Sequence, residues 1–190
     1  GGGTLDFTDD LGGQIGGSAA VLATTVNADK VQLLTDLYDD TLLAEIDQLE
    51  YSTRRDAAST GFIAGLPAIN LRIDRDGDDA VDAYLVYEPY QDLGNAAVDP
   101  GDWQTWDAIR GGSAKWWSGQ LPGCGQATPC SWTDVVAQWP QARVLEDPDG
   151  LVSPSAPTPT LDGSLGVNLG SFNPELRGAV DALTVSVDGQ

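Results

Sequence analysis

The clearest structural signal in the chain is Leu71-Arg-Ile-Asp-Arg-Asp-Gly-Asp-Asp79, followed shortly by Tyr84-Leu-Val-Tyr87. Leu71 and Ile73 alternate with polar neighbours, which is the two-residue period of a strand with one buried face. The acidic run from Asp74 to Asp79 then forms the turn, in which Gly77 supplies the positive φ that a tight turn favours. We therefore predict an antiparallel hairpin at this point in the chain.

Short runs of the same character recur on both sides of this hairpin. We predict strands at residues 18–26, 30–35, 48–54, 142–146, 165–169 and 179–187, and a single helical turn at 42–46. One longer helix is expected, because Ser131 and Asp134 have the spacing of a capping box. Trp132, Val135, Val136 and Trp139 then follow the spacing of a buried helix face, and Pro140 ends the helix.

These elements predict an all-β fold in a single domain. The chain has 190 residues with 23 glycines and 11 prolines, a composition typical of many turns rather than long helices. Many short strands with one short helix favour an antiparallel β-sandwich of the jelly-roll kind over residues 1–190. Residues 147–163 are rich in Pro, Ser and Thr, and we interpret them as a surface-loop insertion within this domain.

The charge of the chain is strongly negative and restricts its partners. Twenty-nine acidic residues, 24 of them Asp, face nine basic residues, which gives a net charge of −20. Such a surface repels phosphate backbones, so a nucleic-acid partner is not expected. Solubility of an exposed, secreted protein is the favoured explanation of this charge, and Ca²⁺ binding by some of the Asp clusters is the alternative.

The sequence also predicts export. It contains no apolar run of about 18 residues that would span a membrane. It contains no methionine, so we expect the numbering to begin at a mature N-terminus after removal of an export signal. Cys124 and Cys130 flank a turn rich in Gly and Pro, where a short-loop disulfide is geometrically easy. A disulfide indicates an oxidising compartment, and we predict a secreted protein that is extracellular or held at the cell surface.

The hairpin turn is the first candidate metal site. Asp74, Asp76 and Asp78 place carboxylates at alternate positions around a glycine, as in a calcium-binding loop. A helix–loop–helix calcium site would have a Glu at its twelfth position, which is Leu85 here, and its flanks would be helical. The bare turn is therefore the favoured interpretation, and Ca²⁺ is the one cofactor that the sequence suggests.

Aromatic residues provide the candidate glycan site. Six tryptophans are present, and exposed aromatic faces stack on sugar rings. Trp103 and Trp106 should point to opposite faces of one strand, and the adjacent Trp116 and Trp117 should divide likewise. The best platform candidates are Tyr87, Tyr90, Trp103 and Trp106. Packing of nearly all six tryptophans in the core is the favoured alternative.

Catalysis has little support in the sequence. The chain has no histidine, so a Ser-His-Asp triad or a Cys-His pair cannot be assembled, and zinc would lack ligands. Paired carboxylates remain, and Glu88 is the one Glu in a predicted strand beside aromatic residues. An ion pair of Glu88 with Arg72 or Arg54 is the favoured explanation. We predict that the protein is not an enzyme, and a carboxylate-based glycoside-active enzyme is the remote alternative.

An ordered series of motifs resembles a recurring bacterial secreted domain. The series comprises Leu49–Arg54, Ile69–Asp74, Leu85–Pro89, Trp103–Asp107, Lys115–Ser118, the cysteine loop, the Trp132 helix and Gly178–Thr184. The chain departs from the series at residues 147–163. The family resembles concanavalin-like or carbohydrate-binding-module jelly rolls, which implies this fold and export. Such modules often hold a structural Ca²⁺ between the N-terminal segment and the last strand, where Asp6, Asp9 and Asp181 lie. A hydrogen-bonding role of Asp181 in that strand is favoured over this site.

Two non-enzymatic functions follow from these observations. The first is an extracellular structural or adhesive protein that assembles with copies of itself into a fibre or coat. The second is a carbohydrate-binding module whose Trp and Tyr side chains stack on extracellular glycans. We favour the first, because the single domain carries no catalytic partner domain. A row of exposed aromatics on one face would favour the second.

Overall fold

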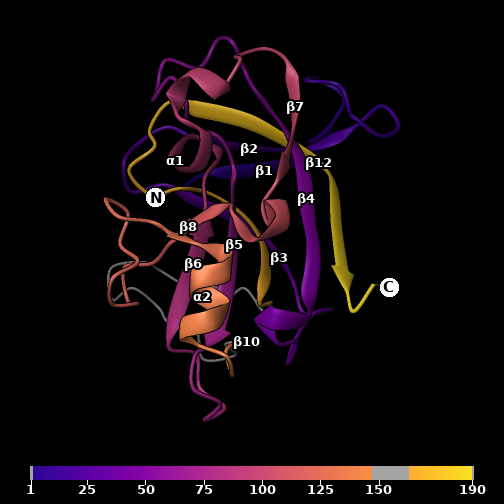
Figure 1. Cartoon of the computed structure of the whole chain (residues 1–190). Coiled ribbons are helices and arrows are strands. Elements are labelled where there is room, and N and C mark those ends of the chain that lie inside the picture. The colour runs from indigo at the N-terminus through magenta and orange to yellow at the C-terminus, as the bar shows by residue number, and fades with distance from the viewer. Residues whose placement is uncertain (1, 147–162, 190) are drawn as a thin grey trace.

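The structure is a computed structural model that describes residues 2–146 and 163–189. Two antiparallel sheets pack together in an all-β sandwich, as predicted (Figure 1). The first sheet has the order β1 (Thr4–Thr8), β2 (Ala19–Thr24), β12 (Leu176–Val187), β4 (Ile46–Arg55) and β7 (Trp103–Asp107). The second has the order β3 (Lys30–Thr35), β11 (Leu165–Gly170), β5 (Ala68–Asp74), β6 (Ala83–Tyr87), β8 (Lys115–Trp117) and β9 (Cys130–Ser131), and β10 (Arg143–Val144) also pairs with β5.

The core of the sandwich depends on the β5–β6 hairpin, which is confirmed. Ile69, Leu71 and Ile73 of β5 point inward and are fully buried. They lie opposite Tyr87, Leu85 and Ala83 of β6, which are fully buried as well. Strict alternation therefore places one row of each strand in the core and leaves the other row on the outer face of the sheet.

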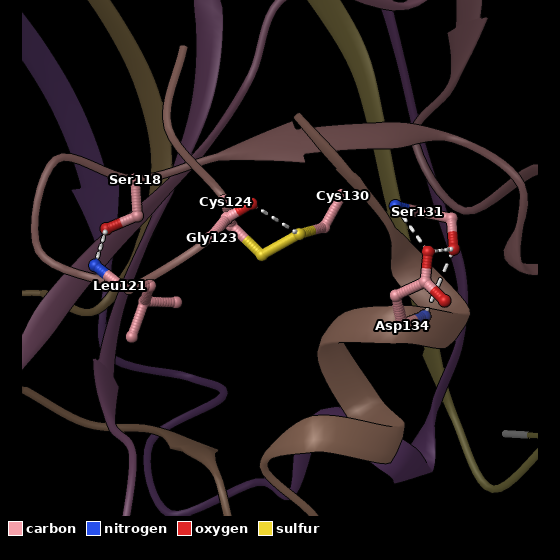
Figure 2. Close-up of a disulfide and its surroundings, with 7 residues drawn as sticks. All are labelled: Ser118, Leu121, Gly123, Cys124, Cys130, Ser131 and Asp134. Carbon is pink, nitrogen blue, oxygen red and sulfur yellow. Dashed lines mark hydrogen bonds between the residues drawn. A yellow bond between two sulfur atoms is a disulfide. The ribbon is translucent and has the colours of Figure 1, made fainter. Parts of the chain in front are cut away.

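Short helices lie in the connections between the strands. They are α1 (Pro89–Leu93), α2 (Trp132–Gln138) and the 3₁₀ turns η1 (Leu43–Glu45), η2 (Asn95–Ala97) and η3 (Arg110–Gly112). The capping box of α2 is confirmed: Ser131 Oγ accepts from the Asp134 N–H at 3.1 Å, and the Asp134 carboxylate accepts from the Ser131 N–H at 3.3 Å (Figure 2). Within residues 2–146 and 163–189, the structure has no helix with the length and apolar character needed to cross a membrane.

The tryptophans divide between core and surface as the strand pattern predicts. Trp106 is buried and donates from Nε1 to Thr53 Oγ1 at 2.7 Å, whereas Trp103 packs partly exposed against a small cluster that includes Ala179. Trp116 is fully buried, while the adjacent Trp117 is half-buried on the outer face. Each pair therefore contributes one ring to the core and leaves the other near solvent.

Several elements were not predicted, and each lacks a strong periodic signal. Strand β1 is an edge strand whose side chains are mostly exposed, so the sequence carries little hydrophobic alternation there. Helix α1 has only five residues, too few for a helical period to be visible. The predicted loop insertion at 147–163 lies outside the described residues, apart from Gly163.

A disulfide joins Cys124 to Cys130, as predicted from the turn between them (Figure 2). Cys124 is fully buried in the main core, and its carbonyl accepts from the Ser118 N–H at 2.8 Å. Cys130 lies in β9, the strand that precedes α2. The bond therefore fastens the 118–124 loop to the edge of the seven-stranded sheet. Such a bond is typical of an oxidising compartment.

Replacing both cysteines by alanine should lower the free energy of unfolding by about 2 kcal/mol, because the unfolded chain loses a short covalent loop. Urea unfolding of the oxidised protein and of the double variant would measure the difference. Equal midpoints would show that the bond does not restrict the unfolded chain. The wild type with its disulfide reduced serves as a control, since its unfolding midpoint should shift toward that of the variant.

Candidate functional site

The outer face of the seven-stranded sheet is hollowed into a cleft of about 580 Å³, a volume typical of small-ligand sites. Its floor is formed by the outward-facing side chains of β11, β5 and β6, and its sides come from α1, the loops around residues 62–66 and 119–126, and residues 170–173. The residues that line this cleft are Lys30, Phe62, Leu66, Ala68, Asn70, Tyr84, Val86, Glu88, Tyr90, Trp117, Gly119, Gln120, Gln126, Asn168, Gly170, Ser171, Phe172 and Asn173.

Two asparagines lie side by side in the floor of the cleft. Asn168 of β11 is opposite Ala68 of β5, so Asn168 and Asn70 are diagonal neighbours on the same face. The Oδ1 atoms of both side chains are buried and accept no hydrogen bond from the described residues. Asn168 Nδ2 is occupied, because it donates to the Gly170 carbonyl at 2.7 Å. Both residues line the cleft, but their amide oxygens lie beneath its surface, so a donor in the cleft would reach them only after the amides rotate.

A glycine of β11 lies next to Asn70 and packs closely against the neighbouring strand. Gly166 is opposite Asn70, and a Cβ at this position would lie 2.1 Å from the carbonyl oxygen of Leu33 in the next strand. No other residue fits this approach of β11 to β3 without a backbone shift. The close packing of β11 on β3 therefore requires glycine at this position.

Aromatic side chains flank the two asparagines. Tyr84 and Trp117 rise from β6 and β8, and both are half-buried. At one end, Phe62 meets Tyr90 of α1 edge to face, with 5.0 Å between the ring centroids. Phe172 is 81% exposed where it lines the cleft. The cleft thus combines ring faces with hydrogen-bonding groups, the combination that binds sugar rings.

Glu88 lies at the aromatic end of the cleft and is hydrogen-bonded to two of its aromatic side chains. It caps α1 at the point where β6 ends, and Pro89 begins the helix. Its Oε2 accepts hydrogen bonds from Trp117 Nε1 at 2.8 Å, from the Tyr90 hydroxyl at 3.2 Å and from Gln126 Nε2 at 3.4 Å. Burial raises the pKa of Glu88, although these three donors oppose the rise. The ion pairs among the described residues do not include Glu88, and Arg54 instead donates to the Leu11 carbonyl.

Lys30 brings a positive charge to the opposite side of the cleft. Its side chain starts on β3 and places Nζ 5.9 Å from the centroid of the Tyr84 ring, in a cation–π contact. Partial desolvation lowers the pKa of Lys30, and the nearby charge of Arg72 lowers it further. The two charged lining residues, Lys30 and Glu88, therefore occupy different parts of the cleft.

The predicted glycan platform is not assembled as a unit. Tyr87 is fully buried and Trp106 is 4% exposed, so neither can offer a ring face to a sugar. Trp103 lies on the five-stranded sheet, away from the cleft. Tyr90 is the one of the four that lines the cleft. Strand alternation could have identified the aromatic residues of the cleft. Leu85 and Trp116 point into the core, so their neighbours Tyr84 and Trp117 point outward, and these two rings line the cleft.

The acidic hairpin brings together the carboxylates of Asp74, Asp76, Asp78 and also Asp82, which the sequence did not suggest. Asp74 is fully buried, and its oxygens accept from the N–H groups of residues 76–79. Arg143 donates to Asp74 from two nitrogens at 3.1 and 3.0 Å. Burial opposes ionisation of Asp74, but the Gly77 N–H and Arg143 outweigh it and lower the pKa of the carboxyl. The buried charge therefore already has partners from the protein itself.

The second predicted calcium set is dispersed. Asp181 accepts from the Ile15 N–H at 2.7 Å and from the Ala182 N–H at 2.8 Å, so it hydrogen-bonds at the last strand. Asp6 is exposed on β1, and Asp9 is exposed just after it. Within the part of the chain that the structure describes, these three do not form a group of converging carboxylates.

Replacing Arg143 by Gln should lower the free energy of unfolding at pH 7 by about 3 kcal/mol, because the buried Asp74 carboxylate loses its counter-charge. A lowered pKa contributes stability that is present above the unfolded-state value and is lost as pH falls through the folded-state value. The difference between variant and wild type should therefore shrink in acid. Urea unfolding at several pH values would measure it, and a pH-independent difference would contradict the pairing.

Replacing Glu88 by Gln should have the opposite pH dependence. A raised pKa contributes stability below the unfolded-state value that is lost as pH rises through the folded-state value. Tyr51 and Tyr90, which the Glu88 charge affects, have raised pKa values and stay neutral over this range. The Gln variant should gain stability relative to wild type from pH 4 to pH 7, measured as melting temperature. A relative loss over that range would show that the carboxylate form is the stabilised one.

Comparisons of the chain with protein-family models, with curated proteins and with solved structures found no match. The resemblance to secreted jelly-roll domains therefore remains an expectation from the sequence motifs. The function has to be argued from the cleft itself.

Proposed function

We propose that the protein is an extracellular, non-enzymatic carbohydrate-binding module whose binding site is the cleft on the seven-stranded sheet. One observation carries this proposal. Tyr84 and Trp117 flank the neighbouring Asn70 and Asn168, whose buried amide oxygens accept no hydrogen bond from the described residues. Ring faces beside unused acceptors match a molecule that is apolar on its faces and carries hydroxyl donors at its rim.

The energetics favour a ligand of this kind. A buried acceptor without a partner costs about 1–3 kcal/mol, and a sugar hydroxyl that donates to Asn70 or Asn168, once the amide has rotated toward the cleft, would remove that cost. Aromatic rings contribute dispersion and exclude water around these bonds. Unpaired buried polar groups are few in folded proteins, and water, an ion or a ligand can supply the missing partner.

Binding is favoured over hydrolysis because of the carboxylates. Glycoside hydrolysis by acid groups uses two of them, about 5–10 Å apart across the scissile bond. Among the described lining residues, Glu88 is the single carboxylate. A raised pKa suits Glu88 to the role of a general acid, but the second carboxylate that hydrolysis uses is not among the described lining residues. The disulfide supports the extracellular setting, where polysaccharides are found.

Self-assembly is the second candidate, and a different surface favours it. An apolar groove of about 380 Å³ runs between the edges of the two sheets and is lined in part by Phe7, Leu33 and Leu183. Phe7 is 73% exposed on the edge strand β1. Edge strands with exposed apolar side chains are the surfaces that another chain would cover. This groove is separate from the cleft, so assembly and glycan binding are compatible.

Replacing Trp117 by Ala should weaken binding to the best oligosaccharide ligand by about tenfold or more, because the sugar loses a stacking face. A glycan array would identify the ligand, and isothermal titration calorimetry would measure the change. Trp103 to Ala is the matched control, since it removes the same ring from the other sheet and should leave affinity within about twofold. Equal effects of the two variants, or no glycan bound by the wild type, would overturn the proposal.

A further inference from the structure

The end of the cleft formed by Glu88, Tyr90 and Trp117, here called the acidic end, has an uneven pattern of hydrogen bonds. All three donors that reach Glu88 bind the same oxygen, Oε2. The other oxygen, Oε1, accepts no hydrogen bond from the described residues. The Trp117, Tyr90 and Gln126 contacts therefore fix the orientation of the carboxylate and leave one of its oxygens for a ligand.

The negative charge of Glu88 at the acidic end also lacks a positive partner among the described residues. The ion pairs among residues 2–146 and 163–189 leave Glu88 out, whereas the buried carboxylates of Asp74 and Asp92 pair with Arg143 and Arg110. Lys30, the one basic residue in the described lining, contacts Tyr84 instead. A desolvated carboxylate without a cationic partner is costly, which is the physical reason why burial raises the pKa of Glu88. A cation supplied by a ligand would remove this cost.

The rings around Glu88 suit the same kind of ligand group. Trp117 and Tyr90 each hold Glu88 through a polar atom, and Phe62 packs against Tyr90. Ammonium groups are attracted to aromatic faces as well as to carboxylates. The net charge of −20 also raises the concentration of cations near the protein and lowers that of anions.

We infer that the cleft prefers an oligosaccharide of amino sugars with free amino groups, one of which binds the Oε1 side of Glu88 between Tyr90 and Trp117. This inference rests on the proposed glycan binding and names the class of sugar. The same ring without its amino group could still stack on Trp117 and donate to Asn70 and Asn168. It would leave the Glu88 carboxylate without a counter-charge, so it should bind less tightly.

The test uses isothermal titration calorimetry at pH 6. It compares the β-1,4-linked hexasaccharides of glucosamine, of N-acetylglucosamine and of glucose. We expect the wild type to bind the glucosamine hexamer about tenfold more tightly than the other two, because an ammonium–carboxylate ion pair replaces a hydrogen bond from a neutral hydroxyl or amide to the Glu88 carboxylate. Raising the salt concentration to about 0.5 M should reduce this ratio, because salt screens ion pairs.

Two variants separate a local contact from general attraction to an acidic protein. Replacing Glu88 by Gln keeps the shape of the side chain and should bring the glucosamine-to-glucose ratio close to one. Replacing Asp102 by Asn changes the net charge by the same amount at an exposed position outside the cleft, and should keep the ratio. Equal loss in both variants would assign the preference to the overall charge and overturn the inference.

The remaining outcomes distinguish this inference from the proposed function. If the wild type binds the three hexamers equally well and Trp117 to Ala weakens all of them, glycan binding stands and the amino-sugar preference is wrong. If it prefers a neutral hexamer, the preference is wrong as well. If it binds none of these hexamers and no other glycan on an array, the inference and the proposed function both fail.

Discussion

Strand β5 is buried on both of its faces, and this constraint determines both the stability of the sandwich and the character of the cleft. Every residue from Ala68 to Asp74 is buried. The inward row is aliphatic and forms the core, but the outward row contains Asn70, Arg72 and Asp74. A buried polar group needs a partner, since leaving it without one costs about 1–3 kcal/mol. Asp74 is paired by Arg143 and by its own hairpin loop, whereas the Asn70 oxygen has no partner among the described residues and lies just beneath the floor of the cleft. The same strand thus carries a structural ion-pair cluster at one end and part of the floor of the cleft at its centre.

The disulfide connects the fold to the cleft. Gln126 lies within the loop that the bond between Cys124 and Cys130 closes, and its amide donates to both Glu88 and the Tyr90 hydroxyl. The loop has no regular secondary structure, so without the bond its residues would be held by few contacts. The covalent link therefore restricts one wall of the cleft as well as the unfolded chain. Oxidation matters for the geometry around Glu88 for the same reason.

Local patterns predicted the fold better than they predicted the site. The alternation in β5 and β6 and the capping box of α2 are encoded within a few residues, and all three are confirmed. Asn70 and Asn168 are neighbours only because β5 pairs with β11. These strands are almost 100 positions apart in the chain, and one sequence does not reveal such a pairing. Glu88 was noticed for its aromatic neighbours, but the ion pair expected with Arg72 or Arg54 is not among those of the described residues, and Arg54 lies on the other sheet. Its partners Trp117 and Gln126 come from later segments and could not be assigned without the fold.

Basic residues are scarce in this chain, so a buried carboxylate without a basic partner is notable. With nine basic residues against 29 acidic ones, most carboxylates must remain solvated at the surface. Two of the arginines join distant segments: Arg143 binds Asp40, Asp74 and Asp79, and Arg177 binds Asp10 and Asp56. Solvated acids need no such partner, because water stabilises their charge. Glu88 belongs to neither group, being largely desolvated and outside the described ion pairs. Since the protein field outside the cleft is negative, a cationic ligand is the partner that both the local carboxylate and the whole surface favour.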